Sequence, residues 1–407
     1  MSLNDTPSAN RLHIGFFGLR NAGKSSVVNA VTGQDLAVVS GRPGTTTDPV
    51  QKAMELLPLG PVVIIDTPGY DDDEQELGQK RVLRTKRVLN KTDVAVLVVD
   101  GTKGLQKDDR ELLALFREKN IPHVVAFNKK DLFEKAPADV LCVSAVTGEG
   151  IFELKERLGA LAPKESGRKL LSDLVSPDGL VVLVTPIDES APKGRMILPQ
   201  VQAIRELLDA HAKCFVVQED RVAEAIADLK HPPKLVMADS QVIKTVNAQT
   251  PEGIPLTTFS TQMAYSKSDI VEMARGAATL SLLKNGDRVL IGETCSHHPQ
   301  KDDIGRVKIP RWLRERTGAD LKIDVAVGKD FPDDLTPYRI VIQCGGCVVT
   351  RQHMLARLRQ AHEQGVPMTN YGLTISYLQG VLERILSCHP EALQAYRNAL
   401  QEGRNAL

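Results

Sequence analysis

Residues 18–25, GLRNAGKS, constrain the fold of this chain more than any other segment. They follow a short apolar run, HIGFFGL, and precede KSSVVNAVTG, whose pattern predicts a helix. In such a loop the glycines let backbone N–H groups turn toward phosphate oxygens, and the helix N-terminus adds its dipole. Lys24 would neutralise β- and γ-phosphate charge, and the Ser25 hydroxyl would bind Mg²⁺. The loop residues expected to bind a nucleotide are Gly18, Asn21, Ala22, Gly23, Lys24, Ser25 and Ser26.

Three further motifs follow, each at the end of an apolar, β-branched run. They are DTPG (66–69), NKKD (128–131) and SA (144–145). Strands that alternate with helices over residues 11–160 predict a mostly parallel sheet, so these motifs should meet at one edge. Asp66 would reach the metal through water and the Gly69 amide would contact the γ-phosphate. The base-binding residues expected are Asn128, Lys129, Asp131, Ser144 and Ala145, with the Asp131 carboxylate accepting two hydrogens from guanine.

Taken in order, the four motifs resemble those of the translation-factor class of small GTPases over residues 11–160. The resemblance implies GTP or GDP with Mg²⁺, and it implies that GTTTD (44–48) is switch I. Thr46 is then the best candidate for a second Mg²⁺ ligand, with Thr45 and Thr47 left open. Tyr70 stands where Ras-like enzymes carry the glutamine that orients water, so hydrolysis needs other help.

Asn21 adds a detail to that resemblance. It occupies the position at which the tRNA-modification and ribosome-assembly GTPases bind a potassium ion. The cation supplies charge that an arginine finger would otherwise give. We therefore expect slow, potassium-stimulated GTP hydrolysis, with Lys24, Asn21 and Thr46 in catalytic roles.

Composition narrows the class of protein. At 407 residues, two or three domains are expected. Lys plus Arg and Asp plus Glu are equal, at 51 each, and aromatic residues make up 4%. A neutral chain that is poor in stacking residues predicts neither a nucleic-acid partner nor a membrane partner. The N-terminus shows no secretory signal and no apolar run is long enough to span a bilayer, so we expect a cytoplasmic protein with reduced thiols.

Two polar segments, 163–179 and 251–268, are interpreted as linkers. The predicted fold is α/β throughout, in three domains. These are a P-loop GTP-binding domain (1–167), a small α/β dimerisation domain (168–262) and an α/β cluster-binding domain (263–407).

The remaining signal is a pair of cysteines, Cys344 and Cys347, in CGGC after the run YRIVIQ. A second run, RVLIGET, ends at Cys295, which is followed by His297. If the two strands are parallel neighbours, the three thiols converge. A redox pair is possible but leaves Cys295 and His297 unexplained, whereas zinc and an iron–sulfur cluster fit about equally well. The other cysteines, Cys142, Cys214 and Cys388, are interpreted as packing residues.

A GTPase domain, a middle α/β domain and a last domain with Cys-x-His and a distant CxxC resemble the [FeFe]-hydrogenase maturation GTPases over essentially the whole chain. The resemblance implies a homodimer with a [4Fe–4S] cluster on Cys295, Cys344 and Cys347 and an exchangeable fourth site. It implies a scaffold that receives a diiron precursor from two radical-SAM maturases, HydE and HydG, and delivers it to apo-[FeFe]-hydrogenase. GTP would act as a switch for partner release.

The chain departs from that family at one position. Gln343 stands where the family commonly has histidine, and a carboxamide is a poor iron ligand. His297 is then the candidate fourth ligand, with His298 and Asp302 as substitutes. Two other functions stay open. One is an RNA- or ribosome-associated, potassium-stimulated GTPase with a structural zinc site, and the other is a nucleotide-regulated thiol oxidoreductase.

Overall fold

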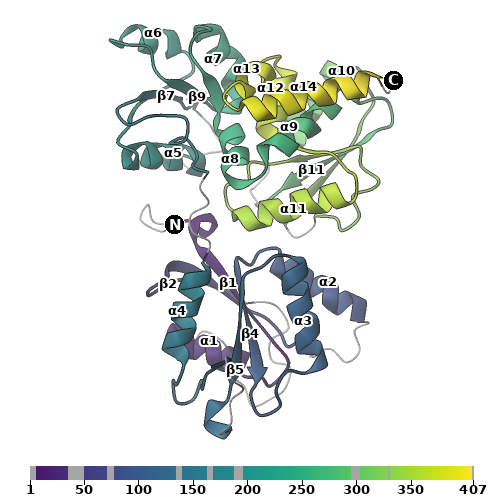
Figure 1. The fold of residues 1–407 in the computed structure, drawn as a ribbon. Helices are drawn as coiled ribbons and strands as arrows, with labels where there is room; N and C mark the ends of the chain where they lie inside the picture. Colours follow the sequence, from purple (N-terminus) through teal and green to yellow (C-terminus); the bar gives the residue numbers. More distant parts are fainter. Residues whose placement is uncertain are drawn as a thin grey trace. The chain divides into compact units, whose positions relative to one another are not determined.

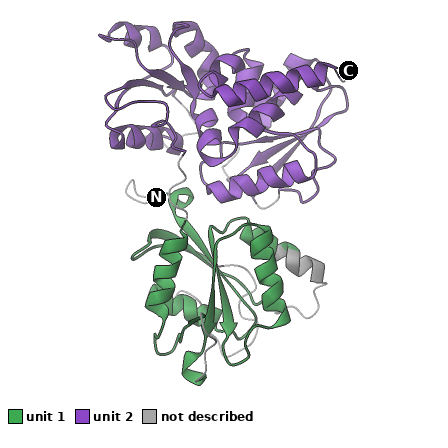
Figure 2. Ribbon diagram, in the orientation of Figure 1, with its two compact units in different colours: residues 1–165 green, residues 166–407 purple. Residues whose placement is uncertain are grey.

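The computed structural model describes residues 6–34, 50–70, 78–133, 140–162, 168–187, 196–294, 303–328 and 331–405. The chain divides into two compact units, residues 1–165 and 166–407 (Figure 2). Each unit is an α/β structure built on its own sheets (Figure 1). None of the helices in the described ranges is long and apolar enough to cross a membrane.

Unit 1 contains one six-stranded sheet in the order β2-β3-β1-β4-β5-β6. All neighbouring strands are parallel except the pair β2 and β3, which confirms the expected mostly parallel sheet. The strands are β1 (Leu12–Phe17), β2 (Val50–Leu56), β3 (Gly60–Asp66), β4 (Val94–Asp100), β5 (His123–Asn128) and β6 (Leu141–Cys142). The helices are α1 (Lys24–Thr32), α2 (Gly78–Leu89), α3 (Lys107–Glu118) and α4 (Ile151–Leu161).

Both faces of this sheet are buried. Along β4, Val94, Val96 and Val98 enter one core with residues of α1 and α4, whereas Leu97 and Val99 enter a second core with residues of α3. A strand that is covered on both faces carries apolar side chains at every position, so continuous apolar runs mark such strands. Strand β2 lacks such a run. It lies at the sheet edge with mostly exposed side chains, so its apolar pattern did not predict a strand.

Unit 2 contains two four-stranded sheets, and every strand pair in them is parallel. One has the order β10-β9-β7-β8, with β7 (Leu180–Val184), β8 (Lys213–Val217), β9 (Leu235–Ala238) and β10 (Leu256–Thr258). The other has the order β12-β11-β13-β14, with β11 (Arg288–Glu293), β12 (Lys322–Val327), β13 (Ile340–Gln343) and β14 (Met368–Asn370).

Helices surround both sheets of unit 2. They are α5 (Leu198–Asp209), α6 (Val222–Ala227), α7 (Ile243–Gln249), α8 (Phe259–Lys267), α9 (Ile270–Ala278), α10 (Ile309–Thr317), α11 (Arg351–Glu363), α12 (Tyr371–Leu378), α13 (Leu382–Leu386) and α14 (Pro390–Asn405). Helix α14 packs along α9 (Figure 1). One hydrophobic core includes Val184 and Val236 from the first sheet together with Ile291 and Ile342 from the second.

The prediction that residues 251–268 form a linker is wrong, because this segment contains β10 and α8. Its threonines are buried and their hydroxyls are bonded within the fold. Thr258 caps α8 by accepting the Thr261 N–H at 3.1 Å. Gln262 Nε2 lies 2.7 Å from Thr257 Oγ1. A segment of polar composition therefore belongs to the core here, because side-chain hydrogen bonds satisfy its buried polar groups.

The first predicted linker, 163–179, is also partly core. Leu170, Leu171 and Val175 are buried in a cluster with residues of β7 and β9. The predicted boundary at residue 262 lies inside α8. The predicted limits of the three domains stay a prediction.

Candidate functional site

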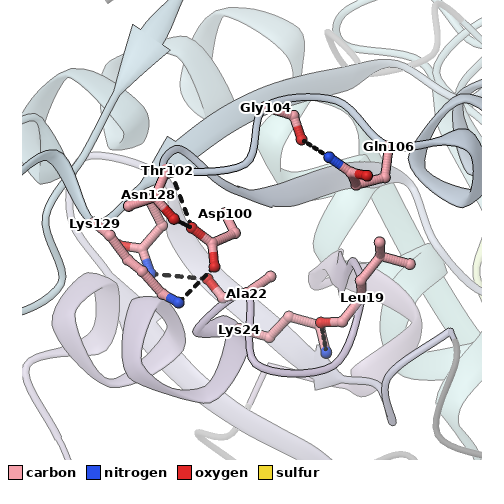
Figure 3. Close-up of polar contacts among 9 residues, drawn as sticks. All are labelled: Leu19, Ala22, Lys24, Asp100, Thr102, Gly104, Gln106, Asn128 and Lys129. Carbon is pink, nitrogen blue, oxygen red and sulfur yellow. Dashed lines mark hydrogen bonds and ion pairs between the residues drawn. The ribbon is translucent and has the colours of Figure 1, made fainter. Parts of the chain in front are cut away.

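The phosphate loop lies between β1 and α1, as its sequence predicts. Gly23, the residue before α1, has φ of 87°, and a Cβ there would lie 2.3 Å from Asn128 Nδ2, so only glycine fits. Asn21 also has a positive φ, of 61°, and its side chain is exposed. Lys24 is buried, and its Nζ donates to the Leu19 carbonyl oxygen at 2.8 Å (Figure 3). The ammonium group that is expected to bind phosphate is therefore hydrogen-bonded to the backbone of the same loop.

The expected Mg²⁺ ligands lie together at the ends of α1 and β3. Ser25 Oγ donates to Asp66 Oδ2 at 2.8 Å. Asp66 is buried, and its Oδ1 has no hydrogen-bond partner among the described residues. Burial raises the pKa of this carboxyl, while the Ser25 hydroxyl and the Lys24 charge oppose the rise. A buried carboxylate oxygen beside a serine hydroxyl suits a hard cation such as Mg²⁺.

The base-binding motif is cross-linked to the phosphate loop by Asn128 at the end of β5. Its Nδ2 donates to the Ala22 carbonyl oxygen at 3.0 Å (Figure 3). Its Oδ1 accepts from the Ala145 N–H at 3.2 Å. Ser144 donates its hydroxyl to Asp131 Oδ1 at 2.6 Å. The carboxylate expected to read guanine is therefore held in place from the SA motif.

Three contacts at this edge were not predicted from the sequence. Lys129 Nζ forms an ion pair with Asp100 Oδ2 at 2.7 Å, and Thr102 also donates to Asp100 (Figure 3). Partial burial opposes ionisation of Asp100, but these donors hold its pKa below the usual value. Thr67 donates its hydroxyl to the Phe16 carbonyl oxygen at 2.6 Å. The only signal for Asp100 was its place at the end of a strand, which it shares with Asp66 and Asn128.

Tyr70 is buried in the core of unit 1, and its N–H donates to the Gly18 carbonyl oxygen at 3.1 Å. Its ring is thus packed inside unit 1. Thr46 lies outside the described residues, as do Cys295, His297, His298 and Asp302.

The cysteine segment follows β13. Strands β11 and β13 are parallel neighbours, with Gly292 opposite Gln343, which confirms the expected strand arrangement. Thr294, which precedes Cys295 in sequence, donates its N–H to Cys344 Sγ at 3.3 Å, and its hydroxyl lies 3.2 Å from the same sulfur. The chain leaving β11 therefore lies against the first cysteine of CGGC.

The turn that carries Cys347 is held by Lys267 from α8. The ammonium group donates to the carbonyl oxygens of Gly346, Cys347 and Val349 at 3.2, 3.1 and 3.0 Å. Burial lowers the pKa of Lys267 to about 8, and the two thiols nearby oppose that change. Burial, with the Cys344 charge second, raises the pKa of Cys347.

The other thiols lie in apolar surroundings. Cys142 is packed against one core of unit 1, and Cys214 and Cys388 against a core of unit 2. Burial raises the pKa of Cys388 to about 11. Within the described ranges, which do not include Cys295, no three His, Cys, Asp or Glu side chains gather closely enough to bind a metal ion.

The fold and the nucleotide motifs of unit 1 define a P-loop GTPase domain. A family model described as "50S ribosome-binding GTPase" matches residues 13–129. Two more models match unit 2: "Hydrogen maturase F dimerization domain" over residues 170–268 and "Hydrogen maturase F tetramerization domain" over residues 271–388. Together these two cover more than half of the chain, which therefore belongs to the hydrogen maturase F family.

Curated relatives match only part of this chain. The tRNA modification GTPase MnmE of Natranaerobius thermophilus is 31% identical over 154 residues, which is 35% of this chain and 33% of that protein. GTPase Der of Xanthomonas campestris is 31% identical over 170 residues, 39% of this chain and 37% of that protein. The chain thus spans about a third of the length of these relatives.

A solved structure of a variant of Aquifex aeolicus Era, bound to GDP and aluminium fluoride, is 19% identical. The match covers 51% of this chain and 93% of that one, with a TM-score of 0.34.

Proposed function

We propose that this protein is a GTP-hydrolysing scaffold of [FeFe]-hydrogenase maturation that holds a [4Fe–4S] cluster on Cys295, Cys344 and Cys347. Membership of the hydrogen maturase F family supports the pathway. The observation that carries the cluster is the pairing of β11 with β13, which brings the residue before Cys295 to Cys344 Sγ.

GTP hydrolysis is proposed from the residues around the phosphate loop. Lys24 and the loop amides bind the phosphates, and Ser25 with Asp66 would hold Mg²⁺, which neutralises charge on the β- and γ-phosphates. Asp131 accepts from the guanine edge, and Asn128 keeps the base site and the phosphate loop at a fixed separation. Asn21 is proposed to bind K⁺, and Thr46 to complete the Mg²⁺ site. Hydrolysis is proposed to be slow, because Tyr70 replaces the water-orienting glutamine.

The cysteine segment suits an iron–sulfur cluster. Cys344 Sγ meets N–H and O–H donors, which stabilise thiolate charge, and Lys267 places a partly buried cation beside the turn. Cys295, Cys344 and Cys347 would hold the cluster, whose chemistry is to accept an electron or an exchangeable ligand. His297 is proposed as the fourth ligand, with His298 and Asp302 as substitutes. The partners proposed are HydE, HydG and apo-[FeFe]-hydrogenase, with GTP acting as the release switch.

Self-association fits the matched dimerization domain, and β8 is the edge that we propose for it. Among the described residues β8 pairs with β7 alone, and its Phe215 and Val216 are 40% and 38% exposed. An edge strand with exposed apolar side chains offers free N–H and C=O groups to a second copy of the chain.

The alternative, an RNA- or ribosome-associated GTPase with a zinc site, is less well supported. MnmE and Der each match well under half of this chain, whereas unit 2 is matched by hydrogen maturase F models. A thiol oxidoreductase is less favoured as well. A redox pair of Cys344 and Cys347 gives no role to Cys295, although the preceding residue, Thr294, contacts Cys344 Sγ.

The test is anaerobic reconstitution with iron and sulfide, followed by reduction, EPR and metal analysis. The full chain is compared with Cys295→Ser, Cys344→Ser and the matched control Cys214→Ser. We expect a cubane-type signal in the parent and the control, and its loss in the other two variants. A parent that binds one tight zinc and no iron would reject the cluster and return the RNA-associated alternative to consideration. A GTPase assay with Lys24→Ala tests the other half of the proposal.

A further inference from the structure

The side chain of Gln343 is fully buried at the end of β13, directly before the first cysteine. In the pairing of β13 with β11, the residue opposite Gln343 is Gly292. A Cβ on residue 292 would approach Gln343 Oε1 to 2.8 Å, so glycine at this position leaves the space that the carboxamide occupies. The carboxamide of Gln343 therefore occupies space that any larger residue at position 292 would fill.

Arg357 from α11 fixes which way the carboxamide faces. This guanidinium is buried, stacks on the Phe331 ring at 4.3 Å and donates to the Gly328 carbonyl oxygen at 2.7 Å. It also donates to Gln343 Oε1 at 2.8 Å. Arginine has only donors, so the atom facing it must be the carboxamide oxygen. The NH₂ group is then directed to the other side, where Nε2 lies 3.4 Å from Cys344 Sγ.

A donor directed at a ligand sulfur changes the electronic properties of a cluster without binding iron. Hydrogen bonds to sulfur stabilise negative charge, and the reduced cluster carries one more negative charge than the oxidised cluster. Removing a donor therefore lowers the reduction potential. The two Thr294 donors act on the same sulfur, so Gln343 completes a set of donors around Cys344.

We infer that Gln343, oriented by Arg357, is a positioning residue that donates a hydrogen bond to Cys344 and raises the reduction potential of the cluster. The inference rests on the cluster proposed above. It assigns to the glutamine a role distinct from that of an iron ligand, and it makes Arg357 part of the same device.

The experiment is an EPR-monitored redox titration of the reconstituted full chain. The parent is compared with Gln343→Met, which keeps the volume and removes the donor. It is also compared with Gln343→Glu, which keeps the shape and the contact to Arg357 but presents oxygen to sulfur. The matched control is Gln360→Met, because Gln360 lies on α11 like Arg357 but donates to the Pro332 carbonyl oxygen, away from Cys344. Iron and sulfide content and the melting temperature are measured for each protein.

We expect the Met variant to shift the ratio of reduced to oxidised cluster at fixed potential by about three- to tenfold toward the oxidised form. A tenfold shift is about 59 mV for one electron. The Glu variant should shift further in the same direction, and the control should match the parent. If every protein holds a full cluster but the Gln343→Met and Gln343→Glu variants have the same midpoint potential as the parent, the inference is wrong and the cluster proposal stands. If the parent takes up no iron, both are wrong.

Discussion

Asn128 and Ala22 are joined by a hydrogen bond of 3.0 Å that connects the end of β5 to the phosphate loop, 106 residues apart in the sequence. Asn128 is buried, and its other amide atom accepts from Ala145. One side chain therefore ties together three of the four nucleotide motifs.

Replacing this asparagine tests that relationship. Asn128→Ala leaves the Ala22 carbonyl oxygen and the Ala145 N–H without their partner, at a cost of about 1–3 kcal/mol. We expect affinity for a fluorescent GDP analogue to fall by roughly 5- to 100-fold, as measured by fluorescence titration. Asn398→Ala, an exposed change on α14, is the control. Unchanged affinity in Asn128→Ala would mean that the loops are positioned without this bond.

At the Mg²⁺ site, we expect Asp66→Asn to stabilise the metal-free protein but to weaken the stabilisation that Mg²⁺ and GDP give. Because burial raises the pKa of Asp66, its ionised form destabilises the metal-free fold above that pKa. Asp66→Asn removes this charge, so we expect its melting temperature without metal to rise above that of the parent. With Mg²⁺ and GDP the parent should gain more stability than the variant. Calorimetry in EDTA and in Mg²⁺–GDP measures both, and a variant that gains as much as the parent would exclude Asp66 from the metal site.

The potassium hypothesis is tested at Asn21. Its backbone is left-handed, so Asn21→Gly removes the amide oxygen without backbone strain, whereas alanine would add about 1 kcal/mol. We expect the parent to hydrolyse GTP at least several-fold faster in KCl than in NaCl at equal ionic strength. The glycine variant should show equal rates in both salts. Phosphate release is the measurement, and equal rates in the parent would refute the hypothesis.

The exposed edge of unit 2 gives a prediction about self-association. Phe215→Glu places a charge on β8, where a second strand would pair, and like charges on two copies would repel. We expect this variant to sediment as a smaller species than the parent at the same micromolar concentration. Val201→Glu is the control, since Val201 is 41% exposed but lies on α5. If both variants sediment like the parent, β8 is not an interface.

His389 gives a prediction about pH. Its ring stacks on Tyr265 and its Nε2 lies 3.0 Å from Gln262 Nε2, so protonation would place two donors face to face. Burial, with a smaller effect from Arg168, lowers the pKa of His389 from 6.5 to about 4. Between these values the unfolded chain binds more protons, so the free energy of unfolding falls as the pH falls.

The expected loss is on the order of 3 kcal/mol between pH 6.5 and 4. Urea unfolding of the parent and of His389→Phe over this range measures it, and the variant should show a smaller slope. His231→Gln, an exposed change, should keep the slope of the parent. A parent and a His389→Phe variant with equal slopes would contradict this origin of the pH dependence.

The sequence predicted unit 1 well because its functional residues end strands whose apolar runs are continuous. Lys24, Asp66 and Asn128 come together because parallel strands present their ends at one edge. The ion pair of Lys129 with Asp100 could not be predicted, since it depends on how two loops meet. That Gln343 is a poor iron ligand stays a prediction from its side-chain chemistry. Its contact with Arg357 could not be predicted, because it depends on how α11 packs against the end of β13.

Unit 2 was predicted less well where polar residues are buried. Residues 251–268 were interpreted as a linker because they are rich in Pro, Thr and Ser. In the fold, Thr258 caps α8 and Gln262 contacts His389, so the hydroxyls are satisfied internally. A single sequence does not indicate such a network, because each bond joins residues from separate elements.

The shared core of unit 2 has a consequence for how this protein can be divided. The two hydrogen maturase F models meet near residue 270, yet Val184 and Val236 on one side of that point pack in the same core as Ile291 and Ile342 on the other. Cutting the chain there would expose apolar surface on both fragments. The two family segments are therefore not separate units of cooperative unfolding, and a disturbance of either sheet should lower the melting temperature of both.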